Sequence, residues 1–344
     1  MKLNIRKYIP DGFISCLLLM IILAYLIPGI GKEGETIELK YVIRYGIALL
    51  FFFYGLRLNL EKIRRDISNW RIHVVIQSIT YILFPLVVLS FYPFFAGTEN
   101  EILWLSVFFL SVLPSTVSSS VVMVSIAEGN VTSAIFNASI SGIIGIFITP
   151  LWLSLFWNKN NGSLDFGSVL INLILQIMVP LIAGLLLHNF WGTWATRNKK
   201  RLSLFDKSVI LLIVYNSFSD AFDKGVFAEI QNQKLLFLFA AIIVLFFIIF
   251  EGTKKIIHLL NFNREDGITV LFCGSKKSLV HGSVMISVLF PGNSIGSLLL
   301  VSVMIYHAFQ LFYISIVAHK YQRQFISEKI RITTNPKSTQ LHTL

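Results

Sequence analysis

The sequence is dominated by long apolar runs that recur along its whole length. Ten of them are about 17 to 25 residues long, the length that an α-helix needs to cross the hydrocarbon core of a bilayer. In a membrane such helices satisfy their own backbone hydrogen bonds. We therefore predict an all-α polytopic membrane protein with ten transmembrane helices. The predicted spans cover residues 12–28, 41–58, 72–95, 102–126, 132–157, 166–190, 204–222, 235–257, 267–290 and 295–318.

Composition agrees with a membrane location. Of the 344 residues, 55% are hydrophobic and only 14% are charged, whereas about a quarter of the residues of a soluble domain are charged. The net charge of +11 comes from Lys and Arg residues in short segments between spans, which argues against a nucleic-acid-binding face. The two cysteines, Cys16 and Cys273, lie within apolar runs and predict no disulfide framework. No cleavable signal peptide is evident, so we expect the first span to be retained.

The basic residues also predict the orientation of the chain. Short cytoplasmic segments carry an excess of Lys and Arg, and most of the 29 such residues fall on one side if the N-terminus is inside. Ten spans then place both termini in the cytoplasm, and we expect the membrane to be the bacterial inner (cytoplasmic) membrane. Residues 1–344 form one transmembrane domain in this interpretation, with a basic cytoplasmic tail at 321–344.

An internal repeat relates the two halves of the chain. Residues 119–130 align without gaps on residues 282–293, and four of the twelve positions are identical. This offset maps the fourth span onto the ninth and the fifth onto the tenth, which gives five helices per repeat, at about 12–157 and 166–320. An odd number of helices inverts the second copy, and inverted repeats of this kind build secondary transporters. We predict discontinuous crossing helices at spans four and nine.

Two adjacent lysines in the ninth span mark the predicted binding site. A charge at mid-membrane costs about 2.5 to 3.5 kcal/mol, so Lys276 and Lys277 are expected to face a protein interior or a water-filled cavity. Gly274, Ser275 and Ser278 surround them, a composition typical of an interrupted helix. We predict that all five residues bind substrate. The alternative is that the lysines extend to the cytoplasmic interface.

The fourth span carries a matching interruption. A proline and a series of hydroxyl residues lie in the middle of the apolar run, where proline frees a backbone carbonyl and the hydroxyls can bind freed groups or a ligand. The alternative is a simple proline kink that the serines stabilise. The substrate-binding residues predicted here are Pro114, Ser115, Thr116, Ser118, Ser119 and Ser120.

Other polar residues within the spans complete the predicted site. Asn137 lies in the fifth span, while His307 and Gln310 are three residues apart and share one face of the tenth helix. Each could line the site or form an ordinary interhelical hydrogen bond. Gln77, with Ser119 and Ser120, is the candidate set for an ion. The sequence has no spaced metal-ligand cluster and no phosphate-binding loop, so we predict no metal and no cofactor.

Four short motifs carry a resemblance to a known family. These are FCGSKKSL at 272–279, LPSTVSSS at 113–120, AEGN at 127–130 and YHAFQ at 306–310. With them the chain resembles the bile acid:sodium symporter superfamily, and most closely its SBF-like branch, over nearly its whole length. The resemblance implies a core of spans three to five and eight to ten, a panel of the remaining spans, and small organic anions as substrates bound between them.

The chain departs from the sodium-coupled branch of that superfamily at the residues that would hold sodium. The resemblance aligns Phe272 with a carboxylate, and Ala134 and Ala138 with hydroxyl ligands. Pro114, Ser119, Gly274 and Gln77 are kept. We therefore predict that the standard sodium sites are not used, and the choice between sodium and proton coupling stays open.

These residues are compatible with three functions. The leading hypothesis is a secondary active transporter of small organic anions that works by alternating access, with a lysine in place of the bound sodium. The second, suggested by relatives linked to calcium homeostasis, is a membrane regulator or sensor that binds an effector without net transport. The third is an intramembrane enzyme with Ser275 or Ser278 as nucleophile and a neutral neighbouring lysine as base. It is disfavoured because adjacent residues of a helix do not face each other. We predict that the protein is not an enzyme.

Overall fold

The computed structural model of the protein describes residues 12–28, 39–58, 69–116, 118–157, 171–223, 232–290 and 295–334, and every regular element within these ranges is helical. The first half contains α1 (Gly12–Leu26), α2 (Leu39–Arg57), α4 (Trp70–Ser78), the π-helical η4 (Ile79–Leu83), α5 (Phe84–Leu89), the short 3-10 helix η5 (Tyr92–Phe94), α6 (Glu101–Val112), α7 (Ser118–Ile126) and α8 (Val131–Trp157). The second half contains the π-helical η6 (Ile174–Met178), α10 (Val179–Leu186), α11 (His188–Arg197), α12 (Lys199–Asp223), α14 (Asn232–Leu259), α15 (Arg264–Gly274), α16 (Leu279–Leu289) and α17 (Ile295–Thr334).

Within the described ranges, six helices are long and apolar enough to cross a membrane, or seven if a bent pair of helices counts as one span. This confirms an all-helical integral membrane protein. The structure does not establish the predicted number of ten. The first predicted span is a short helix, the fourth and ninth are each two short helices with a break between them, and the sixth is the bent pair.

The sixth predicted span is wrong at its C-terminal end. The apolar run predicts an end at Phe190, but the helix ends at Leu186 and the chain turns by 97° into α11. The His188 ring donates from Nδ1 to the Leu56 carbonyl over 2.8 Å, which holds the start of α11 against α2. Phe190, Trp191 and Trp194 are exposed on α11, and aromatic residues of this kind gather at membrane surfaces rather than in the hydrocarbon core.

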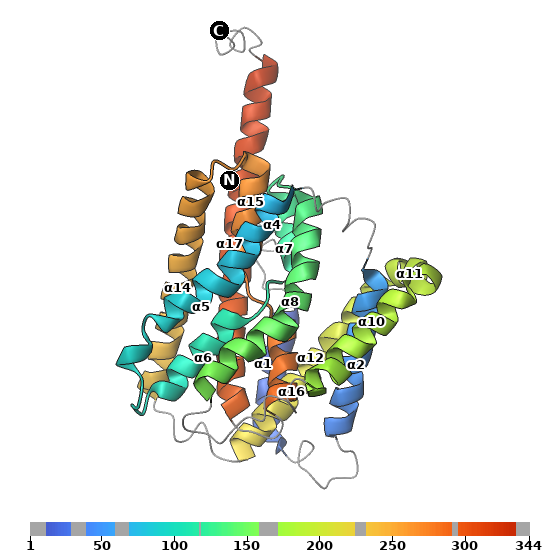
Figure 1. Ribbon diagram of the computed structural model, residues 1–344, viewed down its shortest axis with the longest axis vertical. Helices are drawn as coiled ribbons and strands as arrows, with labels where there is room; N and C mark the ends of the chain where they lie inside the picture. The colour runs from blue at the N-terminus through green and yellow to red at the C-terminus, as the bar shows by residue number, and fades with distance from the viewer. Residues whose placement is uncertain are drawn as a thin grey trace.

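The helices form two groups (Figure 1). One contains α1, α2, α10, α11 and α12, and the other contains α4 to α8 and α14 to α17, while α12 joins them through contacts with α16 and α17. This division matches the panel and core that the resemblance implied. α17 continues beyond the predicted end of the tenth span to Thr334 and projects from the rest of the molecule (Figure 1).

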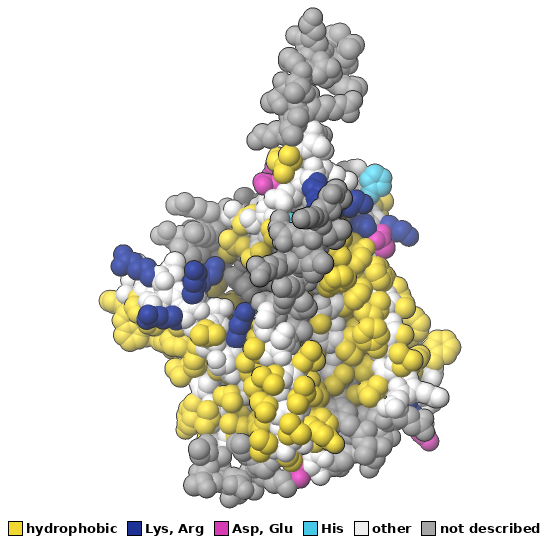
Figure 2. Space-filling view, turned by 180° about the vertical axis from the view of Figure 1, so that it is seen from behind, with side chains coloured by type: hydrophobic (Ala, Val, Ile, Leu, Met, Phe, Trp, Pro, Cys, Tyr) yellow, Lys and Arg dark blue, Asp and Glu magenta, His cyan; other side chains and the backbone are white. Residues whose placement is uncertain are grey.

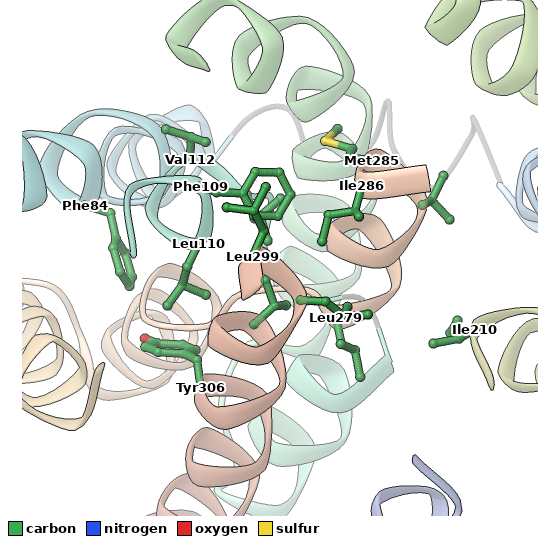
Figure 3. Close-up of a cluster of buried hydrophobic side chains, with 14 of the residues drawn as sticks. Phe84, Phe109, Leu110, Val112, Ile210, Leu279, Met285, Ile286, Leu299 and Tyr306 are labelled. Atoms are coloured by element: carbon green, nitrogen blue, oxygen red, sulfur yellow. The ribbon is translucent and has the colours of Figure 1, made fainter. Parts of the chain in front are cut away.

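Apolar side chains fill the larger group and also cover its outside. Figure 3 shows Phe84, Phe109, Leu279, Leu299 and Tyr306 from four different helices packed around the middle of the group. The face in Figure 2 carries apolar side chains over its lower part, and Lys and Arg side chains at the level of α11 and toward the end from which α17 projects. Apolar surface on this scale is what a bilayer covers.

Two glycines let α2 and α10 approach more closely than any other residue would allow. A Cβ atom added to Gly55 would lie 2.1 Å from the Leu181 carbonyl oxygen, and one added to Gly184 would lie 2.0 Å from the Phe52 carbonyl oxygen. Close contact of two backbones through small residues is a common way to pack helices in membranes. These glycines therefore fix how closely α2 and α10 pack within the smaller group.

Candidate functional site

Both interruptions that the sequence predicted are present. α6 ends at Val112 and α7 begins at Ser118, while α15 ends at Gly274 and α16 begins at Leu279. Leu113 is extended, as expected for a residue that precedes proline, and Ser278 accepts from the His281 N–H at the start of α16. We call residues 113–116 and 275–278 the two breaks.

The two breaks contact each other and exchange hydrogen bonds. The Ser278 N–H donates to the Pro114 carbonyl over 2.9 Å, and the Ser115 hydroxyl donates to the Cys273 carbonyl over 2.6 Å. Each break therefore satisfies backbone groups that the other leaves without a helical partner.

Small residues of α8 make room for the breaks. A Cβ atom on Gly145 would lie 3.0 Å from the Pro114 ring, and one on Gly142 would lie 2.7 Å from Nε2 of His281. Directly before Gly142, the Ser141 hydroxyl accepts from the Ser115 N–H over 3.0 Å. α8 thus supports both interruptions from one side.

Lys277 is buried and its ammonium is fully hydrogen-bonded. The group donates to the carbonyl oxygens of Thr80, Ser111 and Leu113 over 2.8, 2.6 and 2.8 Å. Its nitrogen also lies 4.2 Å from the centre of the Phe84 ring. An ammonium has three N–H donors, so none remains for a ligand in this conformation.

Lys276, the neighbouring residue, is equally buried and has no partner. Its side chain is 0% exposed, and within the described residues Nζ makes no hydrogen bond. The Cys273 thiol and the His307 ring are close enough to interact electrostatically with it. Because both lysines lie inside the protein, the structure does not support the alternative that they extend to the interface. A protonated lysine without a partner inside the protein is a candidate contact for an anion, because the anion would neutralise its charge.

Gln310 holds the second break in place. Its Oε1 accepts from the Lys277 N–H over 2.9 Å, and its Nε2 donates to the Lys277 carbonyl over 2.7 Å. The same Nε2 lies 3.0 Å from Nδ1 of His307. Tyr306 adds a further contact, because its hydroxyl donates to the Ser275 carbonyl over 2.7 Å. The face of α17 predicted from His307 and Gln310 therefore lies against the break.

The described hydroxyl side chains after Ser115 bind mainly one another. The Thr116 hydroxyl lies 2.8 Å from those of both Ser119 and Ser120, and Ser120 is buried beside α15. The side chain of Ser118 lies outside the described part of the chain. At the second break, Gly274 packs closely against Ile79.

The predicted ion-binding residues are divided between two places. Gln77 donates to Oδ1 of Asn137 over 3.2 Å, and Asn137 lies 2.8 Å from the His73 ring. No hydrogen bond among the described residues joins this cluster to Ser119 or Ser120. The structure therefore brings Gln77 together with Asn137, and leaves the two serines with Thr116.

Sequence reasoning missed several residues that build the site. The carbonyls of Thr80 and Ser111 gave no sequence signal, because any residue supplies one. His73, Tyr81 and Tyr306 are polar side chains within apolar spans, and that signal was available for each of them. Tyr81 donates to the Ser141 carbonyl and so links α8 to the helix that contacts Lys277.

Comparison with known proteins identifies the family. Residues 11–323 match the SBF-like CPA transporter family. The chain is 35% identical to the Escherichia coli protein named "Putative symporter YfeH" over 92% of this chain and 94% of that protein. It is 30% identical to "Sodium/bile acid cotransporter 7" of Mus musculus over 84% of this chain and 85% of that protein. It is also 35% identical to "Uncharacterized protein PA2026" of Pseudomonas aeruginosa, over 92% and 95% of the two chains.

These matches extend over almost the whole chain, and they confirm the resemblance that the four short motifs carried. The family is one of membrane transporters, which also confirms that the protein is not an enzyme. With its apolar helices and its two contacting breaks, the chain belongs to the SBF-like CPA transporter family.

Proposed function

We propose that the protein is a secondary active transporter of small organic anions, and that Lys276 is the residue that binds the anion. The observation that carries this proposal is the side-chain nitrogen of Lys276, a residue of the second break, which is buried and has no hydrogen-bond partner among the described residues. Burying a charged group without a partner costs free energy. A transporter retains such a group where a ligand of opposite charge neutralises it.

The surroundings of Lys276 favour an anion over a cation. The described residues show no carboxylate bonded to it, and the His307 ring beside it can add a donor. α16 begins three residues further on, and the N-terminal end of a helix carries partial positive charge. Lys276, the His307 ring and the start of α16 are thus the sources of positive charge and of donors near the second break.

The relatives support the same substrate class. One is named a symporter and another a cotransporter of sodium and bile acid, and a bile acid is an organic anion. We propose ten spans in two inverted repeats of five, in which α6 with α7 and α15 with α16 are spans four and nine. The larger group of helices moves against the smaller one during alternating access, with both termini in the cytoplasm of a bacterial inner membrane.

A two-step experiment tests the proposal. Purified protein is first screened by thermal unfolding against organic carboxylates and sulfonates, with organic cations and neutral compounds of similar size as controls. Anions that raise the melting temperature are then used in counterflow into proteoliposomes. Saturable counterflow of such an anion supports the proposal. Binding without flux would instead favour an effector-binding regulator, and stabilisation by cations alone would overturn the anion assignment.

Transport is expected not to depend on sodium. Phe272, Ala134 and Ala138 are fully buried and supply no side-chain oxygen, whereas a sodium site needs several oxygen ligands. Initial uptake rates measured in sodium, potassium and choline buffers of equal ionic strength should agree. A steep dependence on sodium would show that Gln77 and the serines after Pro114 still form a cation site.

Replacing Pro114 by alanine is expected to lower the rate of transport several-fold. Alanine restores a backbone N–H and frees Leu113 from its extended conformation, so α6 can extend into the break. Pro150 lies inside the continuous helix α8, and Pro150→Ala is the matched control. The counterflow rate of each variant is measured, normalised to the amount of folded protein and compared with that of the parent protein. Equal rates would mean that the first break is only a kink.

A further inference from the structure

The ammonium of Lys277 occupies a site built entirely from backbone carbonyls. Its three oxygen partners come from the π-helical segment η4, from the last turn of α6 and from Leu113 at the start of the first break. No carboxylate bonds to the group in the described part of the chain. A neutral amine has only two N–H donors, so three carbonyl partners require the protonated form.

Two prolines leave two of these carbonyls without a helical partner. In η4 the Phe84 N–H bonds to the Ile79 carbonyl, and the next residue, Pro85, has no N–H to give to Thr80. At the end of α6, Pro114 likewise has no N–H, and the Ser115 N–H donates to the Ser141 hydroxyl instead of to the Ser111 carbonyl. Neither carbonyl therefore has a backbone N–H donor in its own helix, and both can accept from Lys277.

Converging carbonyl oxygens are the ligands with which proteins replace the hydration shell of a monovalent cation. The face of the Phe84 ring, 4.2 Å from Nζ, adds a further contact that favours a positive charge. A divalent ion would need carboxylates, which are absent from the residues described around this group.

We propose that this carbonyl cluster is a monovalent cation site, and that Lys277 is its permanently attached cation. The lysine side chain reaches from the second break to the C-terminal end of α6, where the first break begins. It therefore holds the two broken helices together without an ion that can dissociate. A variant without the Lys277 side chain is expected to bind a small free cation at the carbonyls instead. Free ammonium or methylammonium ions should bind most tightly, because they carry the same N–H donors. This site is separate from the proposed anion contact at Lys276.

The test replaces the lysine and supplies the cation from solution. Purified full-length Lys277→Ala is compared with Lys277→Met by thermal unfolding in ammonium, methylammonium, potassium or sodium chloride, and in choline chloride of equal ionic strength. Both variants should melt roughly 10 °C below the parent protein in choline, because buried carbonyls lose their donors. Ammonium or methylammonium should restore about half of the loss in Lys277→Ala, saturably, because an ion that binds the native state stabilises it.

Three controls make the result specific. Lys277→Met should show no rescue, because its side chain fills the space that a free cation would enter. The parent protein and Lys276→Ala should not respond to ammonium, because their carbonyl site is already occupied.

If Lys277→Ala cannot be purified, a fluorescent fusion is solubilised in ammonium and in choline and compared by size-exclusion chromatography.

A folded peak in ammonium alone would support the proposal in that assay, and aggregation in both salts would overturn it. A variant as stable as the parent protein, or a loss that no small cation restores, would also overturn it. None of these measurements uses transport. The carbonyl site can therefore fail while the proposed transport function stands, and the reverse is equally possible.

Discussion

Replacing Lys276 by methionine is expected to abolish binding and transport of the organic anion while leaving the protein at least as stable as before. Removing one partner of a buried charge pair costs about 2 to 5 kcal/mol, which corresponds to a loss in affinity of at least roughly 30-fold. The unliganded protein has no partner for this ammonium in its described residues, so removing it also removes a desolvation cost. The melting temperature should stay the same or rise.

The measurement pairs a binding isotherm with thermal unfolding of the same preparation. Lys255 is exposed on α14, and Lys255→Met is the matched control, with unchanged affinity expected. A Lys276→Met variant that binds and transports the anion normally would remove Lys276 from the site. A variant that loses stability as well would show that the ammonium has a structural role like the one proposed for Lys277.

Replacing either Gly55 or Gly184 by alanine is expected to destabilise the protein strongly. Elsewhere in a helix this change stabilises by about 0.5 to 1 kcal/mol, because glycine loses the most conformational freedom on folding. Here the added carbon would lie 2.1 or 2.0 Å from a carbonyl oxygen of the facing helix, and a backbone cannot move aside as a side chain can. We expect a loss of at least about 3 kcal/mol as α2 and α10 separate.

Thermal unfolding of the purified variants checks this expectation. Gly252 lies in α14 with no atom within 4 Å of the position of an added Cβ, so Gly252→Ala is the matched control and should be neutral or stabilising. A Gly55→Ala variant with an unchanged melting temperature would mean that the two helices do not pack as closely as the structure shows. Reduced transport with normal stability would instead indicate that the smaller group of helices changes its internal packing during the cycle.

The features of this protein that depend on local chemistry could be predicted from its residues alone. Apolar runs long enough to cross a bilayer predicted the all-helical membrane fold, since no other backbone arrangement of such runs satisfies its hydrogen bonds in lipid. Pro114 and the small residues around Gly274 predicted where the two helices are interrupted, because proline acts on its own helix wherever it lies. The burial of the lysine pair followed from the cost of exposing a charge to lipid.

Only the tertiary structure distinguished the two lysines. They are adjacent and chemically identical, and their difference depends on carbonyls 197 and 166 residues earlier in the chain, at Thr80 and Ser111. Those carbonyls are available because of Pro85 and Pro114, and a hydrogen bond between such distant residues has no periodic signal in a sequence. The 97° turn before α11 was decided in the same way, by the contact of His188 with Leu56 on another helix.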